Sequence, residues 1–201
     1  MTSGNGGCSS AVELSVVVRA VVGSKPISRP ITRIFMSLGL LHMVNIAHSN
    51  QQISAFEFAK PPRILIIEAR FYNHIQDMLL AGVTESLEQA GATYQIITVP
   101  GALEIPSTLQ FFAAQGFDAF VVLGCVIRGE TTHYEIVSNE SARGIMDVAL
   151  KHNLAVGNGI LTVENEAQAI DRADKTRQNK GGGAAIAALS MLSLKQKSSG
   201  V

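Results

Sequence analysis

The segment at residues 123–133 holds the residue types best suited to chemistry. It reads Leu-Gly-Cys-Val-Ile-Arg-Gly-Glu-Thr-Thr-His and stands directly before a stretch with a helical pattern. Glycines let a backbone approach a ligand closely, and the free amides at the start of a helix bind anions. An imidazole both accepts and donates protons near neutral pH. The segment therefore indicates an anion-binding loop with an acid/base group, although His133 alone is equally compatible with a polar helix cap.

Two earlier segments contain groups that suit a flat, polar ligand. Residues 99–106 read Val-Pro-Gly-Ala-Leu-Glu-Ile-Pro and lead into a helix, and Glu104 offers a carboxylate acceptor to hydroxyl groups. Phe71 follows an apolar run at residues 63–69. Its ring could stack on a heterocycle, or it could be a core aromatic that caps the sheet. Glu104 could likewise be an ordinary first-turn glutamate.

Polar and basic residues also follow the last apolar run of the chain. Asn158 lies between two glycines within residues 156–165, and glycines in a strand indicate that something approaches the backbone closely. Basic residues gather beyond it, at Arg172, Lys175, Arg177 and Lys180. Such a run is typical of a solvated face, but guanidinium and ammonium groups also bind phosphate.

Each of these segments follows a short apolar run, and this order predicts the elements that position them. Apolar, β-branched runs predict strands, whereas apolar residues repeated every three or four positions predict helices. We expect strands at residues 63–69, 94–99, 119–126 and 154–163, and helices at about residues 75–87, 105–114, 134–152, 167–170 and 184–194. Gly91 is expected to end the first helix in the left-handed conformation. The alternation predicts an α/β fold with a parallel sheet, in which ligands bind beyond the carboxyl ends of the strands.

The composition excludes some classes of protein. The chain has 201 residues, a formal net charge of zero and 47% hydrophobic residues, so it can bury a substantial core but offers no broad basic surface for nucleic acid. Its two cysteines, Cys8 and Cys125, lack the paired spacing of a zinc site or a redox dithiol. We therefore expect no metal, no nucleic-acid partner and a reducing, cytoplasmic environment.

Residues 1–60 differ in composition from the rest of the chain. They are poor in acidic residues and show no regular strand and helix pattern. Such a composition occurs in transit peptides, but the pattern of a secretory signal is not found. Arg33, His42 and Asn45 interrupt the apolar run at residues 31–47, which argues against a membrane span. We expect a poorly ordered extension at residues 1–60, with Met43 as a candidate start, and one folded domain at residues 61–201.

Five motifs, in order, resemble those of the bacterial lumazine synthases, the 6,7-dimethyl-8-ribityllumazine synthase family. They are EARFYN, VPGALEIP, LGCVIRGETTHYEIVSNE, GNGILTVEN and NKGGGAA, and the resemblance covers residues 61–201. It implies a flavodoxin-like, three-layer α/β/α fold with a four-stranded parallel sheet. It also implies the condensation of 5-amino-6-(D-ribitylamino)uracil with 3,4-dihydroxy-2-butanone 4-phosphate, the penultimate step of riboflavin biosynthesis. The family needs no metal or organic cofactor and forms a homopentamer or a higher homo-oligomer.

The same resemblance implies a role for each candidate site residue. His133 would be the acid/base residue, and Phe71 would stack on the pyrimidine ring. Further contacts to the pyrimidine and its ribityl chain would come from Ala102, Leu103, Glu104, Cys125, Val126 and Ile127. Loop amides at Glu130 and Thr131 would hold the butanone phosphate, and the neighbouring subunit would supply Asn158 and Arg172.

Three positions depart from the usual pattern of that family. Asn158 stands where many members have an aromatic residue, and Cys125 replaces a common threonine. We interpret Cys125 as a small packing residue and not as a nucleophile. Thr176 stands where some members have a lysine, so the cation that assists Arg172 at the phosphate could be Lys175, Arg177 or Lys180.

Three other functions stay open on the sequence. A non-catalytic flavin or lumazine binder would use the same stacking and ribityl contacts, but it has no need of His133 or of the basic residues. A flavodoxin-like electron carrier would need a loop rich in serine and threonine after the first strand, where this chain has Arg-Phe-Tyr-Asn-His. A shell protein with vestigial activity would be distinguished by its turnover.

Overall fold

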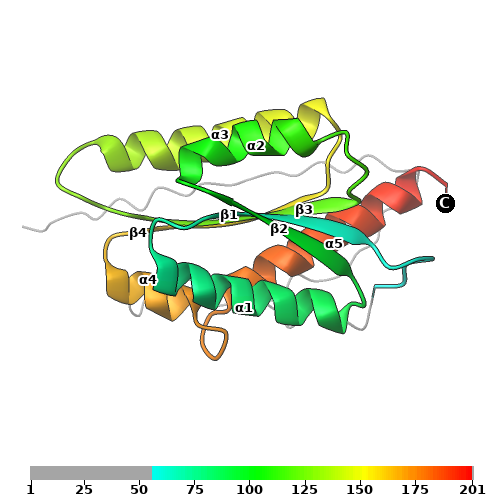
Figure 1. The fold of residues 1–201 in the computed structure, drawn as a ribbon, viewed down its shortest axis with the longest axis horizontal. Helices are drawn as coiled ribbons and strands as arrows, with labels where there is room; N and C mark the ends of the chain where they lie inside the picture. Colours follow the sequence, from blue (N-terminus) through cyan, green and yellow to red (C-terminus); the bar gives the residue numbers. More distant parts are fainter. Residues whose placement is uncertain (1–55, 201) are drawn as a thin grey trace, which may run out of the picture. The chain divides into compact units, whose positions relative to one another are not determined.

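Four parallel strands alternate with helices in a computed structural model of the chain, which describes residues 56–200 (Figure 1). The elements are β1 (Arg63–Ala69), α1 (Asn73–Gln89), β2 (Thr93–Val99), the 3₁₀ helix η2 (Ala102–Glu104), α2 (Ile105–Phe112), β3 (Ala119–Ile127), α3 (His133–Lys151), β4 (Val156–Val163), α4 (Glu166–Ala173) and α5 (Lys180–Ser198). The strand order is β2-β1-β3-β4. The predicted α/β fold with a four-stranded parallel sheet is confirmed.

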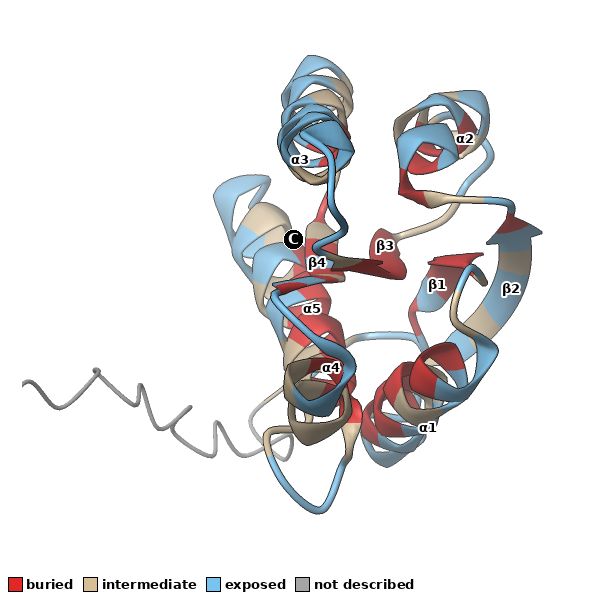
Figure 2. Ribbon diagram, turned by 90° about the vertical axis from the view of Figure 1, so that its left-hand side faces the viewer, coloured by how far each residue is buried: buried red, intermediate tan, exposed pale blue. Residues whose placement is uncertain are grey.

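Helices cover both faces of the sheet, which makes three layers. Helices α2 and α3 lie on one face, and α1, α4 and α5 lie on the other (Figures 1 and 2). The central strand β1 feeds both cores: Ile64 and Ile66 pack towards α1 and α5, while Leu65 and Ile67 pack towards α2 and α3. A strand covered on both faces needs apolar residues at every position, which explains the unbroken apolar run. The register places Glu68 of β1 beside Thr98 of β2.

The helix ends agree with the sequence in one case and differ from it in another. Gly91 follows α1 with φ +67°, so the predicted left-handed ending is confirmed. Helix α5 begins at Lys180, earlier than expected, and includes a run of three glycines. Asn179 caps it by accepting a hydrogen bond from the Gly182 backbone N–H at 3.0 Å. A Cβ at Gly181 would lie 2.1 Å from the Leu79 carbonyl oxygen, so the close approach of α1 requires glycine there.

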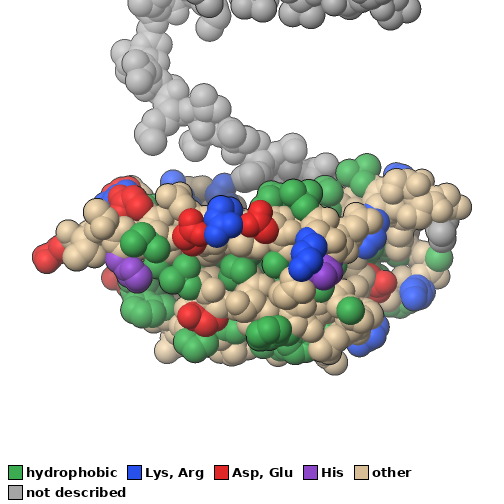
Figure 3. Space-filling model, turned by 90° about the horizontal axis from the view of Figure 1, so that it is seen from above, with side chains coloured by type: hydrophobic (Ala, Val, Ile, Leu, Met, Phe, Trp, Pro, Cys, Tyr) green, Lys and Arg blue, Asp and Glu red, His purple; other side chains and the backbone are tan. Residues whose placement is uncertain are grey.

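The surface and the ends of the described chain complete the fold. Helices α2 and α3 carry exposed large apolar side chains, including Phe111, Ile136 and Leu150, and hydrophobic and charged groups lie side by side on this face (Figure 3).

At the start of the described chain, Phe56 and Phe58 pack against the core on the α1 side. The candidate start at Met43 and the apolar run at 31–47 lie outside the described residues. Within residues 56–200, none of the helices is both long and apolar enough to cross a membrane.

Candidate active site

A cavity of about 430 Å³ opens beyond the carboxyl ends of β1, β2 and β3, between the starts of α2 and α3. Three loops form its wall, one after each of these strands. The wall contains most of the residues that the sequence singled out: Phe71, Ala102, Leu103, Glu104, Cys125, Val126, Ile127, Thr131 and His133. Loops that are distant in sequence meet here because the strands are parallel and their ends share one edge of the sheet.

Three predicted site residues do not line this cavity. Glu130 is exposed in the loop after β3. Asn158 is exposed on the edge strand β4, and its side-chain oxygen accepts a hydrogen bond from the Ile160 backbone N–H at 2.9 Å. Arg172 lies on α4, where its guanidinium donates to the Gln168 carbonyl oxygen at 3.3 Å. One chain alone therefore does not bring Asn158 and Arg172 to the cavity.

Six wall residues were absent from the predicted set: Tyr72, Pro100, Gly101, Gly129, Tyr134 and Val137. Val137 stands four positions after His133 and therefore lies on the same side of α3, and Tyr134 stands next to the histidine in the first turn. That helical spacing was readable in the sequence. Tyr72 follows Phe71 in the turn before α1, and nothing in the sequence pattern distinguishes it from a core aromatic.

The loop after β1 presents the Phe71 ring to the cavity. Phe71 is 71% exposed, so it is not a core aromatic that caps the sheet. Its ring meets the ring of Tyr72 edge-on, with centroids 5.0 Å apart and an interplanar angle of 70°. One face of the Phe71 ring is thus available for stacking, which is the geometry that a flat heterocycle needs.

The loop after β2 brings a carboxylate to the cavity through a short 3₁₀ turn. Glu104 ends η2 and caps α2, whose first turn contains a proline. A Cβ at Gly101 would lie 3.0 Å from Glu104 Oε2, so the glycine leaves room for the carboxylate above the backbone. Glu104 is exposed, and it can accept hydrogen bonds from the hydroxyl groups of a polyol.

The loop after β3 places an imidazole at the first turn of a long helix. His133 is the first residue of α3, and its backbone N–H donates to Thr131 Oγ1 at 3.4 Å. The N-cap residue, Thr132, makes no side-chain hydrogen bond to the helix. Within residues 56–200 the His133 ring has no hydrogen-bond partner, so it does not act as a polar cap. The first amides of α3 are suited to an anion, and the exposed imidazole of His133 lies beside them.

An exposed arginine braces the start of α3. Arg128 Nε donates to Glu164 at 2.7 Å, its Nη1 bonds to Glu135, and its guanidinium carbon lies 4.0 Å from the centre of the Tyr134 ring. We call this group of four residues the Arg128 clamp. The hydrogen bond that Arg128 donates to Glu135 raises the pKa of Arg128, and the same bond holds the pKa of Glu135 below its usual range. The clamp connects the ends of β3 and β4 to Tyr134 and Glu135, the two residues that follow His133.

The thiol in the cavity wall is chemically quiet. Cys125 is 8% exposed, and burial raises its pKa to about 12. Because the thiolate is the nucleophilic form, this environment agrees with a packing role for Cys125. Among residues 56–200, no cluster of three or more His, Cys, Asp and Glu side chains is arranged to hold a metal ion.

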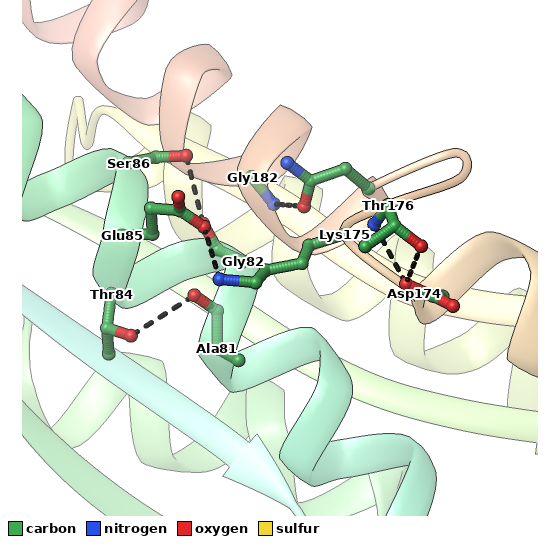
Figure 4. Close-up of polar contacts among 10 residues, drawn as sticks. Ala81, Gly82, Thr84, Glu85, Ser86, Asp174, Lys175, Thr176 and Gly182 are labelled. Carbon is green, nitrogen blue, oxygen red and sulfur yellow. Dashed lines mark hydrogen bonds and ion pairs between the residues drawn. The ribbon is translucent and has the colours of Figure 1, made fainter.

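Two of the basic residues after β4, Lys175 and Arg177, are paired with nearby carboxylates. Lys175 Nζ lies 2.9 Å from Glu85 of α1, and Thr176 donates two hydrogen bonds to Asp174, as Figure 4 shows. The bond from the Thr176 backbone N–H is the main cause of a lowered pKa at Asp174. Arg177 lies 3.5 Å from Asp171. Lys175 and Arg177 therefore serve first to fix the loop between α4 and α5.

Comparison with known proteins identifies close relatives of the domain. Residues 61–196 match the family model described as 6,7-dimethyl-8-ribityllumazine synthase. The enzyme of that name from Sphingopyxis alaskensis is 62% identical over 135 residues, which cover 67% of this chain and 95% of the relative. The one from Bartonella tribocorum is 54% identical, covering 70% and 95%. The 6,7-dimethyl-8-ribityllumazine synthase 1 of Rhizobium meliloti is 56% identical, covering 69% and 94%.

Proposed function

Because this chain belongs to the 6,7-dimethyl-8-ribityllumazine synthase family, we propose that the cavity between the starts of α2 and α3 is its catalytic site. The chain is an enzyme of riboflavin biosynthesis that condenses 5-amino-6-(D-ribitylamino)uracil with 3,4-dihydroxy-2-butanone 4-phosphate and releases phosphate and water. One observation carries the choice of site: Phe71, Glu104 and His133 come from three separate loops and line one cavity.

The pyrimidine binds on the β1 and β2 side of the cavity. Its ring stacks on the exposed face of Phe71, and the Glu104 carboxylate accepts hydrogen bonds from the ribityl chain. The remaining contacts come from the backbone and small side chains of Ala102, Leu103, Cys125, Val126 and Ile127. The availability of the Phe71 ring and the space above Gly101 support this placement.

The butanone phosphate binds at the start of α3. The loop at Glu130 and Thr131 leads directly into the helix, whose first amides point to the cavity side and favour an anion. A phosphate there lies beside the imidazole of His133. This arrangement brings the two substrates together along the short path between the loops after β1 and β3.

His133 moves the protons of the reaction. Imine formation, loss of the phosphate and ring closure each require a proton to be taken up or given, and an imidazole does both near neutral pH. None of these three steps needs a covalent bond to the enzyme. Holding two reactants in contact supplies the rest of the acceleration, because it converts an encounter in solution into a step within one complex.

A second copy of the chain completes the site. Asn158 and Arg172 lie away from the cavity of their own chain, and exposed apolar side chains on α2 and α3 offer a surface for association. We place Arg172 of one subunit at the phosphate held by its neighbour, in a homopentamer or a larger assembly. The enzyme acts in the cytoplasm, and its catalytic domain is residues 61–201, with residues 1–60 as an extension.

Turnover of purified protein tests the activity and the role of His133 together. With both substrates present, lumazine absorbance and fluorescence should rise faster than in the protein-free blank. His133→Ala should slow this rise by about 10²- to 10⁴-fold, the usual contribution of a general acid/base. His152→Ala, at the other end of α3, is the matched control and should react at the wild-type rate. A folded wild-type protein without turnover would favour the binder, and full activity in His133→Ala would remove the histidine from the mechanism.

Mixed assemblies test the shared site. His133→Ala and Arg172→Ala proteins, each weakly active, are unfolded together and refolded as hybrids. Sites that combine an intact His133 with an intact Arg172 should then restore about a quarter of the wild-type rate when equal amounts mix at random. Native mass spectrometry verifies that hybrids formed. If hybrids form without any recovery, the two residues do not meet across an interface.

A further inference from the structure

Glu68 is a buried charged residue that the proposed reaction does not use. It is 3% exposed, and the other buried polar side chains of the described chain are uncharged, namely Gln76, Ser86, Thr108 and Ser141. It lies near the end of β1 but does not line the cavity. Burying a carboxylate is costly unless its oxygens are hydrogen-bonded or paired, so the contacts that hold Glu68 define what it does.

Those contacts join three elements to one carboxylate. Thr98 of β2 donates to Oε1 at 2.9 Å, and the side-chain amide of Gln76 in α1 donates to Oε2 at 3.1 Å. Arg70 Nε lies 3.6 Å from Oε1. The guanidinium of Arg70 also bonds to Asp77 in α1. The Glu68 carboxylate is therefore contacted from both ends of the turn between β1 and α1, by Arg70 before it and by Gln76 after it.

Phe71 sits at the centre of that turn. Its ring is largely exposed and meets Tyr72 edge-on, so the core does not fix its direction. The backbone on either side does. Arg70 precedes it and faces Glu68, while the Tyr72 carbonyl accepts the Gln76 backbone N–H at 3.0 Å, and the Gln76 side chain returns to Glu68. One neighbour of Phe71, Arg70, thus faces the carboxylate directly, and the other, Tyr72, is connected to it through Gln76.

We propose that Glu68 is a positioning residue, which sets the direction of the Phe71 ring and thereby the binding of the pyrimidine. The inference rests on the proposed function, because it takes Phe71 as the platform for that substrate. It assigns to Glu68 no contact with either substrate and no proton transfer. Its effect should therefore appear in the affinity for the pyrimidine and not in the chemical step.

Glu68→Gln tests this role with little change of volume. The amide keeps one acceptor oxygen but loses the charge that faces Arg70, so the turn loosens. The KM for the pyrimidine should rise about threefold to tenfold, as expected for the loss of one charge-assisted contact. The kcat and the KM for the butanone phosphate should change less than twofold. Ser86→Ala is the matched control, because it removes another buried hydrogen bond from α1, to the Gly82 carbonyl, far along the helix from the turn.

A second background separates positioning from general weakening of the fold. In Phe71→Ala protein, there is no ring to direct, so adding Glu68→Gln should leave the KM for the pyrimidine unchanged. If the two effects multiply independently, or if Glu68→Gln lowers kcat and both affinities alike, Glu68 is only structural. Turnover by the wild-type protein distinguishes this result from a failure of the proposed function. If the proposed function were wrong, none of the proteins would show turnover, the wild type included.

A spectroscopic readout needs no turnover. The chain contains no tryptophan, so Phe71→Trp introduces a single reporter at the platform. The pyrimidine alone should quench its emission, and Glu68→Gln in this background should lower the anisotropy of the free protein and weaken the quenching. Unchanged anisotropy and quenching would overturn the proposal. If Glu68→Gln does not fold, Thr98→Val, which removes one donor to Glu68 at constant shape, should shift the same quantities in the same direction.

Discussion

The two faces of the sheet are packed to different degrees. On the face covered by α1, α4 and α5, a Cβ at Gly157 would stand 1.9 Å from the Ala184 carbonyl oxygen. On the face covered by α2 and α3, the two helices touch where a Cβ at Gly144 would lie 2.9 Å from Pro106. Closer to the carboxyl ends of the strands, the cavity opens between them. On the first face, the backbone of a helix lies against the backbone of a strand. On the second face, a cavity remains between the two helices.

Because of this difference, substitutions on the two faces should have different effects, on stability for one face and on catalysis for the other. We call the face covered by α1, α4 and α5 the tight face and the other the open face. On the tight face, backbone atoms of helix and strand lie in contact, and such a contact cannot relax by moving one side chain. Substitutions there should therefore lower the stability of the fold. On the open face, the site residues His133, Phe71 and Glu104 are exposed, and replacing them removes little buried area. Substitutions there should act on kinetics.

The largest expected effect is that of a single methyl group on the tight face. Gly157→Ala forces α5 away from β4 and should lower the free energy of unfolding by about 3 kcal/mol or more, at the upper end for overpacking. Urea unfolding at fixed protein concentration measures it. Gly183→Ala is the control within α5: its Cβ meets nothing within 4 Å, so it should stabilise by about 0.5–1 kcal/mol. Equal stability of Gly157→Ala and wild type would remove the contrast between the faces.

A smaller effect should appear on the open face when the Arg128 clamp is broken. Arg128→Gln frees the start of α3, and the misplaced imidazole should lower kcat roughly tenfold, because small errors of position are costly to catalysis. The clamp is exposed, so the melting temperature should hardly move. Arg143→Gln breaks ion pairs to Glu140 and Asp147 on the same helix away from the cavity and should change neither. A drop in stability without a drop in kcat would contradict the comparison.

The acid titration of the clamp gives a still smaller signal. Arg128 lowers the pKa of Glu135 in the folded protein, so the clamp stabilises above the unfolded pKa and is lost as pH falls through the folded one. Carboxyl NMR should find Glu135 titrating below its value in the unfolded chain, and Arg128→Gln should return it upward. A Glu135 midpoint that is unaffected by Arg128→Gln would mean that the ion pair is not formed in solution.

The order of elements and the centre of the site were readable from the sequence. Each site loop follows an apolar run, and parallel strands bring such loops to one edge, so Phe71, Glu104 and His133 could be expected to meet. Glycines around Asn158 predicted a close approach to β4, and the structure shows that helix α5 makes it, through Ala184. The sequence alone does not show whether a helix or a ligand lies against these glycines.

Other features depend on contacts between distant residues. Glycine at position 181 weakens the start of α5 by its own propensity, and the close approach of the α1 backbone at Leu79 explains it. Glu68 looks like one polar residue in a buried strand. Its partners, Thr98 and Gln76, are set by the register of β1 with β2 and by the docking of α1. Arg172 and Asn158 do not line the cavity of their own chain, so the structure of one chain does not bring them to the site.

The smallest expected effect concerns Cys125 of β3, which lines the cavity but is buried, with its side chain in the core on the face covered by α1, α4 and α5. Its pKa of about 12 leaves almost no thiolate at pH 8, so iodoacetamide should not label it in the folded protein, whereas the unfolded protein should react. Peptide mapping distinguishes it from Cys8. Because the folded pKa is raised, the thiol stabilises the fold below its unfolded pKa of about 8.5, and this contribution is lost as pH rises towards 12. Rapid labelling at pH 8 would show that solvent and reagent reach the buried thiol. The face covered by α1, α4 and α5 would then open at β3 in solution, which would contradict the contrast in packing between the two faces.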